Sequence, residues 1–379
     1  MKQQNRPIGQ PLRVLMVTPR YFPFMGGVET HVHEVGRRLA ASGVDICVLT
    51  SDPIGNLPVH EEIEGMRIWR VRGYPPKLDL YIAPEIANVI GAEHWDILHC
   101  QSYHTFVAPL AMAAALHHHV PYVVTFHSGG HSSSWRNAIR QTQWTMLRPL
   151  FARADRLIGV SEFEAEAFRT TLHLPPEQFV VIPNGGKLPD VAASTQEETD
   201  DDAKLILAVG RLEKYKGHQR VIAAMPDVLQ RFPKAHLIVV GGGPYEPQLR
   251  QQIADMQLAE HVTVRAIPAN ERQAMAELMA RANLITLFSD YEAHPIAVME
   301  AIALGKPVLG TQTSGLQELA DKGWIQTIPL TALPSEAATA IIAQLESPMI
   351  PPQVTLPTWD DCAESLLHVY ESVVTAHNA

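Results

Sequence analysis

Residues 14–49, VLMVTPRYFPFMGGVETHVHEVGRRLAASGVDICVL, contain one complete strand–helix–strand unit. Segments 14–17 and 46–49 are short apolar runs with polar flanks, typical of buried strands in a parallel sheet. Between them, Val28, Val32, Val35 and Leu39 recur at the spacing of one helical face, and Gly43 ends that helix. This stretch predicts an α/β fold, in which helices cover both faces of a parallel sheet.

The same alternation continues along the chain and then restarts. Further strands are predicted at 97–100, 122–125 and 157–160, and, after an interruption, at 205–209, 237–240, 262–264, 284–288 and 308–309. The interruption at 187–203 is polar and acidic, as expected for a linker, so Asp200, Asp201 and Asp202 are interpreted as a solvated charge run and not as a metal site. We therefore predict a first domain over 1–186, a linker over 187–203, a second domain over 204–358 and a separate closing helix within 359–379.

Composition limits the classes of partner and compartment. The formal net charge of −10 argues against nucleic acid as a partner, because phosphate backbones need a basic surface. The three cysteines are odd in number and far apart, which favours buried thiols in a reducing compartment. Residues 1–12 do not resemble a secretory signal, and the longest apolar window, 106–116, is too short to span a bilayer. A cytoplasmic protein is expected.

Residues 291–301, YEAHPIAVMEA, place two carboxylates around a predicted helix start. Pro295 suits the first helical position, which leaves Glu292 in the loop before the helix and Glu300 about one and a half turns inside it. Backbone N–H groups between them form a site for phosphate. One carboxylate could then hold sugar hydroxyls and the other ribose hydroxyls. The alternative is a surface helix with two unrelated glutamates.

Glycines and cations follow three of the predicted strands. Gly210-Arg211 directly follows a strand and Lys216-Gly217 comes shortly after, so two cations that can bind phosphate stand at the mouth of the second sheet. A solvated mixed-charge turn is the alternative, because Glu213 and Lys214 lie between them. Gly26-Gly27 and Gly241-Gly242-Gly243 could let a ligand approach the backbone, although a plain strand-to-helix turn also explains them.

Together these motifs resemble the family-4 retaining glycosyltransferases. The resemblance rests on Gly26-Gly27, residues 181–185 (VIPNG), Gly210-Arg211 to Lys216-Gly217, the Glu292/Glu300 pair and residues 305–308 (GKPV), and it covers nearly the whole chain. It implies the GT-B architecture, with two Rossmann-like domains that face a central cleft. The second domain would hold most of the donor and the first most of the acceptor, and the closing helix would cross back onto the first domain.

The resemblance also assigns roles to individual residues. Arg211 and Lys216, after Gly210, would neutralise the departing nucleotide diphosphate, and Glu292 and Glu300 would contact the donor sugar and the ribose. Backbone around His294, Pro295 and Ile296 would line the sugar and phosphate, although Ala293-His294-Pro295 departs from the family pattern and Pro295 has no N–H. Gly27 would face the diphosphate. His127 would lie near the reacting sugar, with a structural histidine at a strand end as the alternative. No metal and no cofactor beyond the nucleotide-sugar donor is implied.

We thus expect a retaining, metal-independent hexosyltransferase or related enzyme that uses a nucleotide-diphosphate sugar. Its acceptor would be a glycan, a lipid-linked molecule or a small molecule. The expected role is polysaccharide or glycoconjugate synthesis in the cell envelope. A nucleotide-sugar epimerase and a non-catalytic nucleotide-sugar binder are the alternatives. Peripheral membrane contact is a further hypothesis, based on arginines interleaved with apolar residues, namely Trp135, Arg136, Arg140, Trp144, Leu147, Arg148, Leu150, Phe151, Arg153 and Arg156.

Overall fold

The computed structural model describes residues 10–24, 26–75, 82–128, 134–186, 203–268, 271–353 and 355–379, without the side chains of 134–141. The chain forms two compact units. Unit 1 contains Met1–Ser128, Ile139–Asn184 and Pro357–Ala379, and unit 2 contains Gly129–Ala138 and Gly185–Leu356. The predicted linker, including its three aspartates, lies outside the described residues except for residue 203.

Unit 1 is built on an eight-stranded sheet of order β3-β4-β2-β1-β5-β6-β7-β8. All neighbouring strands are parallel except β3 and β4. The strands are β1 Arg13–Thr18, β2 Asp45–Asp52, β3 His60–Ile63, β4 Met66–Arg72, β5 Ile97–Gln101, β6 Tyr122–Thr125, β7 Arg156–Gly159 and β8 Phe179–Val181. The helices are α1 Gly27–Ala41, α2 Glu85–Ala92, α3 Val107–His118, α4 Ser134–Phe151, α5 Glu162–Leu172 and α12 Trp359–Asn378, with a 3-10 turn η1 Pro176–Gln178. The part of α4 from Ile139 onward belongs to unit 1.

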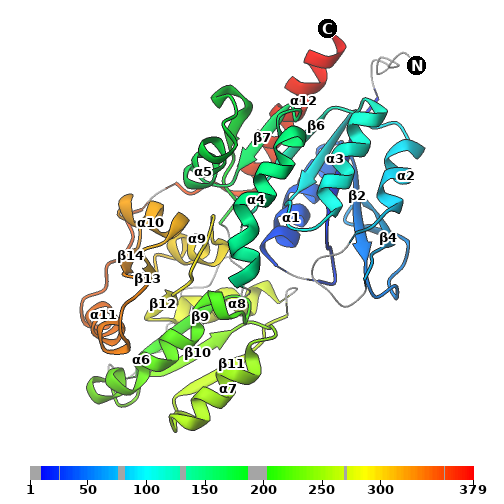
Figure 1. Cartoon of the computed structure of the whole chain (residues 1–379). Helices are drawn as coiled ribbons and strands as arrows, with labels where there is room; N and C mark the ends of the chain where they lie inside the picture. Colours follow the sequence, from blue (N-terminus) through cyan, green and yellow to red (C-terminus); the bar gives the residue numbers. More distant parts are fainter. Residues whose placement is uncertain are drawn as a thin grey trace. The chain divides into compact units, whose positions relative to one another are not determined.

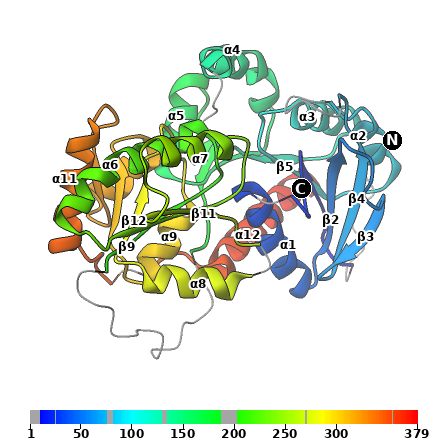
Figure 2. The same ribbon diagram turned by 90° about the horizontal axis from the view of Figure 1, so that it is seen from below.

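Helices lie on both faces of this sheet. A large apolar core joins α2, α3, α4 and α5 to the strands, and α1 and α12 lie side by side against the other face (Figure 2). The prediction that the closing helix packs on the first domain is confirmed, because α12 contacts α1 and β5. In the part of the chain that the structure describes, no helix combines the length and apolarity needed to cross a bilayer.

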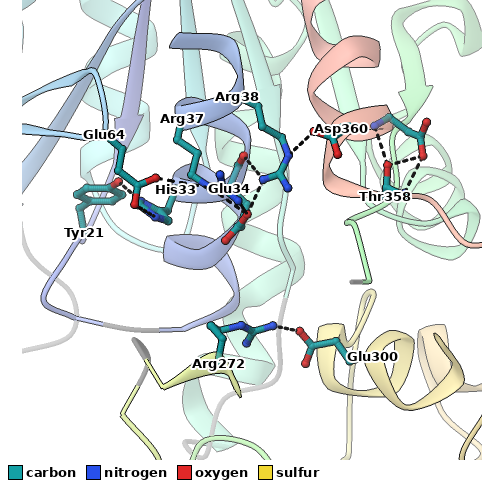
Figure 3. Close-up of polar contacts among 11 residues, drawn as sticks. Tyr21, His33, Glu34, Arg37, Arg38, Glu64, Arg272, Glu300, Thr358 and Asp360 are labelled. Carbon is teal, nitrogen blue, oxygen red and sulfur yellow. Dashed lines mark hydrogen bonds and ion pairs between the residues drawn. The ribbon is translucent and has the colours of Figure 1, made fainter. Parts of the chain in front are cut away.

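Side-chain contacts anchor α12 at its start and in its middle. Thr358 accepts a hydrogen bond from the Asp361 N–H and so caps the helix. The Arg38 guanidinium of α1 lies 2.7 Å from an Asp360 carboxylate oxygen (Figure 3). Deeper in the unit, the Tyr370 hydroxyl lies 2.5 Å from His99 Nδ1 of β5. The last helix is therefore an integral part of unit 1.

Unit 2 is built on a fully parallel six-stranded sheet of order β11-β10-β9-β12-β13-β14 (Figure 1). Its strands are β9 Leu205–Val209, β10 His236–Val240, β11 Val262–Arg265, β12 Leu284–Leu287, β13 Val308–Thr311 and β14 Gln326–Ile328. Its helices are α6 His218–Arg231, α7 Glu246–Asp255, α8 Arg272–Arg281, α9 Ile296–Ala303, α10 Ser314–Asp321 and α11 Pro334–Glu346, with a 3-10 turn η3 Lys214–Lys216. One core contains α6, α7 and α11, and the other contains α8, α9 and α10.

The predicted strands all form, but β3, β4, β8 and β14 were not predicted, and the start of one helix differs by one position. The patterns do not predict the β3–β4 hairpin, whose two-residue turn has positive φ at both Glu64 (48°) and Gly65 (78°). Its first strand, His60–Ile63, alternates between exposed and half-buried residues, so it lacks the apolar run of a central strand. The prediction that Pro295 is the first residue of its helix is wrong by one position: Pro295 is the N-cap in an extended conformation, and α9 begins at Ile296.

Candidate active site

A lysine–glutamate ion pair marks the site in unit 2. Lys216 Nζ lies 2.6 Å from Glu292 Oε1, and these side chains are 16% and 9% exposed. Burial lowers the Lys216 pKa, but the Glu292 carboxylate and Tyr215 together raise it by more, and the net pKa is raised. Lys216 is therefore an ammonium at neutral pH, with two further N–H donors beyond the one given to Glu292.

Gly217 brings this lysine to the glutamate. Its φ is +74°, and a Cβ at this position would lie 1.9 Å from the Phe288 carbonyl oxygen. Only glycine permits both this backbone conformation and this close approach. The turn after β9 is thus pressed against the end of β12, from which the Glu292 loop departs.

The Glu292 loop is held by small polar residues, one on the loop itself and the others at or just after the end of β13. The Ser289 hydroxyl donates to Glu292 Oε1 at 2.7 Å, and the Ser314 hydroxyl accepts from the Glu292 N–H at 2.8 Å. Thr311 donates its hydroxyl to the Ser289 carbonyl at 2.5 Å. A Cβ on Gly315 would meet the Ala293 carbonyl at 2.1 Å, so α10 begins directly against the loop. The sequence patterns did not identify these residues, although small polar residues at 311–315 after a strand were the available signal.

Arg211 lies on the same turn as Lys216 and is more loosely held. Its side chain is 50% exposed, and its guanidinium is 3.4 Å from Glu213. His218, at the start of α6, fixes the backbone of this turn through a 3.1 Å contact between its Nε2 and the Arg211 carbonyl. Burial lowers the pKa of His218 to about 4, so the neutral ring donates Nε2–H to that carbonyl. The backbone is therefore rigid while the Arg211 head remains accessible.

The glycines at 241–243 have a packing role. A Cβ on Gly241 would lie 1.9 Å from the Gly210 carbonyl oxygen, and one on Gly243 would lie 2.5 Å from the Leu212 carbonyl oxygen. Gly210 itself has φ +154° and donates its N–H to the Val240 carbonyl at 3.0 Å. The turn interpretation of 241–243 therefore accounts for Gly241 and Gly243, because both allow the segments that follow β9 and β10 to pack in direct contact.

Helix α9 begins just after the Glu292 loop. Because Pro295 is the N-cap, the Ile296 and Ala297 N–H groups have no partner within the helix, while the Val298 N–H reaches the Pro295 carbonyl at 3.0 Å. Glu300 is 4% exposed, and its carboxylate pairs with the Arg272 guanidinium at the start of α8 (Figure 3). Arg272 is a further residue that the sequence patterns did not identify.

His294 has a different electrostatic environment from that of Lys216. Burial lowers its pKa to about 4, and the charges that act on it, Glu318 and Lys322, belong to α10 and the residue after it. Its Nδ1 is buried, and no hydrogen-bond partner for it is found among the described residues. The ring is therefore neutral, and the predicted role of this residue through its backbone remains a prediction.

Gly27 and His127, the two other predicted site residues, belong to unit 1. Gly26 is the N-cap of α1 and Gly27 its first residue. Among the described residues, a Cβ on Gly27 would meet nothing within 4 Å, and one on Gly26 would meet only the flexible end of Glu29 within 3 Å. Packing within unit 1 therefore does not account for glycine at position 27, unlike position 217.

His127 is held in an unusual conformation at the end of β6. Its φ is +46°, in the left-handed region that few non-glycine residues adopt. Its Nε2 lies 2.7 Å from Gln101 Oε1, and its carbonyl oxygen lies 3.1 Å from His104 Nε2. The next residue, Ser128, donates both its N–H and its hydroxyl to buried Glu164 at 2.5 Å. Such strain, maintained by several contacts, is common at functional sites.

The stretch suggested to contact membrane contributes to the core of unit 1. Trp144 and Phe151 are buried, and Leu147 and Leu150 pack against them. Arg148 donates to the Leu172 carbonyl at 2.7 Å. Membrane contact through this stretch would therefore depend on its remaining arginines, and the side chains of Trp135, Arg136 and Arg140 lie outside the described residues.

No cluster of three or more histidine, cysteine, aspartate or glutamate side chains that could hold a metal ion occurs in the described residues. The three cysteines, which the composition suggests are buried thiols, are all free and buried. Burial raises the pKa of Cys47 and Cys362 to about 12, so these two are protonated and unreactive.

Comparison with known proteins assigns the chain to a family. Residues 25–186 match Glycosyltransferase Family 4, and residues 192–350 match Glycosyl transferases group 1. The chain belongs to the group 1 glycosyltransferases. An uncharacterized glycosyltransferase of Methanocaldococcus jannaschii is 29% identical over 338 residues, covering 81% of this chain and 82% of its own length. A GDP-mannose:cellobiosyl-diphosphopolyprenol alpha-mannosyltransferase of Xanthomonas oryzae is 28% identical over 303 residues, covering 78% and 77%.

Solved structures agree on the fold. Sucrose-phosphate synthase from Thermosynechococcus elongatus superposes with a TM-score of 0.79 at 22% identity, over 97% of this chain and all of the other. The Anabaena protein HepE, solved with UDP and glucose, gives a TM-score of 0.70 at 19% identity over 96% of both chains. The predicted fold class is thus confirmed, and the chain has the GT-B fold.

Proposed function

We propose that this protein transfers a sugar from a nucleotide-diphosphate donor to a glycan, a lipid-linked molecule or a small molecule, with retention of anomeric configuration and without a metal ion. The observation that carries the proposal is the buried Lys216–Glu292 pair, placed between the turn that bears Arg211 and the start of α9. UDP in the HepE structure and GDP-mannose in the name of the Xanthomonas relative support a nucleotide-sugar donor.

The chemistry of glycosyl transfer explains why cations are needed here. As the bond to the sugar breaks, negative charge grows on the leaving diphosphate. Lys216, with donors left beyond its bond to Glu292, and the accessible Arg211 would stabilise that charge. The Ile296 and Ala297 N–H groups of α9 would add fixed dipoles. These groups would take the place of a divalent cation.

Further roles are proposed for the two carboxylates and, separately, for two residues of unit 1. Glu292, oriented by Ser289 and Lys216, would accept hydrogen bonds from the donor sugar, and Glu300 from the ribose. The backbone at Gly27 would approach the diphosphate and His127 the reacting sugar. No carboxylate nucleophile is assigned, in keeping with a front-face mechanism in which the leaving phosphate accepts the acceptor proton.

The test is turnover of a panel of UDP-, GDP- and ADP-sugars by the purified chain, with candidate acceptors and without added divalent metal. We expect one nucleotide sugar to be hydrolysed or transferred at the same rate in EDTA, and NMR to show retained configuration in the product. Activity that EDTA abolishes and manganese restores would overturn metal independence. Incubation of the donor alone identifies an epimerase, if an epimer appears, and binding without turnover identifies a non-catalytic binder.

We further propose a cytoplasmic enzyme of cell-envelope polysaccharide or glycoconjugate synthesis that contacts the membrane peripherally. The diphosphopolyprenol in the name of the Xanthomonas relative supports a lipid-linked acceptor. Co-sedimentation with anionic liposomes at moderate salt tests the contact, and protein left in the supernatant would reject it.

A further inference from the structure

A buried hydrogen-bonded chain in unit 1 ends at His127. Tyr370 of α12 reaches His99 Nδ1 at 2.5 Å, and Thr125 of β6 reaches His99 Nε2 at 2.7 Å. Gln101, the last residue of β5, has no exposed surface, and its amide nitrogen lies 3.2 Å and 3.3 Å from the two ring nitrogens of His99. Its amide oxygen lies 2.7 Å from His127 Nε2. This series of hydrogen bonds thus runs from α12 through the sheet to His127.

The Gln101 contact determines which ring nitrogen of His127 carries a proton. An amide oxygen can only accept a hydrogen bond, so Nε2 must donate. Burial lowers the pKa of His127 well below its ordinary value, with further lowering from His31, His99 and His104, so the ring is neutral and has a single N–H. Nδ1 is then the unprotonated nitrogen and the only hydrogen-bond acceptor of the ring.

We propose that Gln101 is a positioning residue that holds His127 in the Nε2–H tautomer, so that Nδ1 accepts a hydrogen bond from a substrate hydroxyl. The contact between Nδ1 and a substrate hydroxyl rests on the proposed function, in which His127 contacts the sugar. If Nδ1 can only accept a hydrogen bond, the substrate must carry a hydroxyl group at that position. A sugar that lacks this hydroxyl would leave the Nδ1 lone pair without a donor in a site that is 9% exposed.

The first test reads the tautomer directly and needs no substrate. Nitrogen-15 NMR of imidazole-labelled protein should show His127 as a neutral Nε2–H ring from pH 5.5 to 8. Gln101→Leu removes the acceptor and should convert part or all of the signal to Nδ1–H. Gln101→Glu retains an acceptor and adds a charge, so it should keep Nε2–H and make His127 titrate at higher pH. A wild-type Nδ1–H ring, or no change in Gln101→Leu, would overturn the positioning role.

Gln178→Leu is the matched control. Gln178 also lies in unit 1, and its side-chain amide donates to the Phe151 and Ala154 carbonyls at 2.8 Å and 2.6 Å. Gln178→Leu makes the same chemical change as Gln101→Leu, but the lost hydrogen bonds are to backbone carbonyls and not to His127. We expect it to lower the melting temperature and leave the His127 signals as in the wild type. If Gln178→Leu shifts them equally, the tautomer responds to general loosening of unit 1 and the proposal fails.

The second test uses whichever nucleotide sugar turns over, together with its monodeoxy analogues. One analogue should have kcat/KM lower by about 10- to 100-fold in the wild type, as expected when a buried acceptor loses its donor. In Gln101→Leu that penalty should fall below about 3-fold, while Gln178→Leu retains it. An equal penalty in Gln101→Leu and wild type would overturn the substrate contact even if the tautomer result holds. The proposed function would remain intact in that case, because it depends on turnover of the parent sugar.

Discussion

Lys216 Nζ and Glu292 Oε1 lie 2.6 Å apart, so a cation proposed to bind diphosphate and a carboxylate proposed to bind sugar are already in contact. Each residue orients the other: Glu292 raises the pKa of Lys216, and Lys216 fixes the Glu292 carboxylate that Ser289 also contacts. The two residues should therefore act as one unit in catalysis.

A double-mutant cycle tests this coupling. Lys216→Met and Glu292→Gln should each reduce kcat/KM by about 100- to 1000-fold, because each removes charge stabilisation in a partly dry site. The double variant should lose much less than the product of the two, since residues in contact are not additive. Lys214→Met, an exposed cation on the same turn, should stay within about 3-fold of the wild type. Additive losses would show that the pair is incidental. Should Glu292→Gln turn over donor at the wild-type rate, the proposed site is wrong.

Glu300 should act on donor affinity more than on turnover. Glu300→Gln retains shape but loses charge, so we expect weaker nucleotide binding by about 2–4 kcal/mol, measured by calorimetry with the donor's nucleoside diphosphate. If Glu300→Gln binds the nucleoside diphosphate as tightly as the wild type, Glu300 does not contact the ribose.

Arg272→Ala should lower the unfolding free energy of the ligand-free protein by about 1–3 kcal/mol. It leaves the Glu300 carboxylate, which is 4% exposed, without its cation. Urea titration of this variant beside Arg281→Ala, an exposed arginine at the other end of α8, provides the comparison. Equal stability of the two variants would mean that the ion pair contributes nothing.

Gly217→Ala should be far more damaging than Gly305→Ala. Both glycines have positive φ, +74° and +65°, but an added Cβ meets the Phe288 carbonyl at 1.9 Å in the first case and nothing within 4 Å in the second. We expect Gly305→Ala to cost about 1 kcal/mol from conformation alone. Gly217→Ala should cost at least about 3 kcal/mol by urea denaturation and reduce activity, because Lys216 is displaced. Similar costs would contradict the observed backbone contact.

His218 should make stability depend on pH. Its native pKa is about 4, whereas an unfolded histidine has a pKa of about 6.5, so the unfolded chain binds more protons between these values. Its contribution is present above pH 6.5 and is lost as pH falls toward 4, by up to about 3 kcal/mol. His218→Gln should reduce the stability difference between pH 7 and pH 4.5 by about 2 kcal/mol of that total. An unaltered slope would mean that His218 is not buried as a neutral ring.

The sequence predicted most strands of both sheets, because buried parallel strands are continuous apolar runs, as at 205–209 and 237–240. It did not predict the β3–β4 hairpin, whose edge strand His60–Ile63 is half exposed and whose turn uses Glu64 in a left-handed conformation. In the site, the residue types at Lys216 and Glu292 indicated charge chemistry. Their direct contact could not be predicted, because it depends on the fit of Gly217 against Phe288, 71 positions apart.

Supporting residues were missed for a related reason. Ser289, Ser314, Arg272 and Gln101 are common polar residues whose importance depends on what they contact. Ser289 contacts a residue three positions away, but the other three contact residues 22 to 28 positions away in the chain. Ser289 and Ser314 could have been suspected from their positions after strands. Nothing local marks Arg272 as the partner of Glu300.

The anchoring of α12 by Tyr370 and Asp360 has a consequence for the order of synthesis. Segment Pro357–Ala379 belongs to unit 1 but is translated after the whole of unit 2. On the ribosome, every strand and helix of unit 2 is therefore available before unit 1 receives α12. Until then His99 lacks its Tyr370 partner, and α1 alone lies on the sheet face that α12 shares with it. Unit 1, whose synthesis begins before that of unit 2, can therefore complete its fold only after unit 2 has been synthesised.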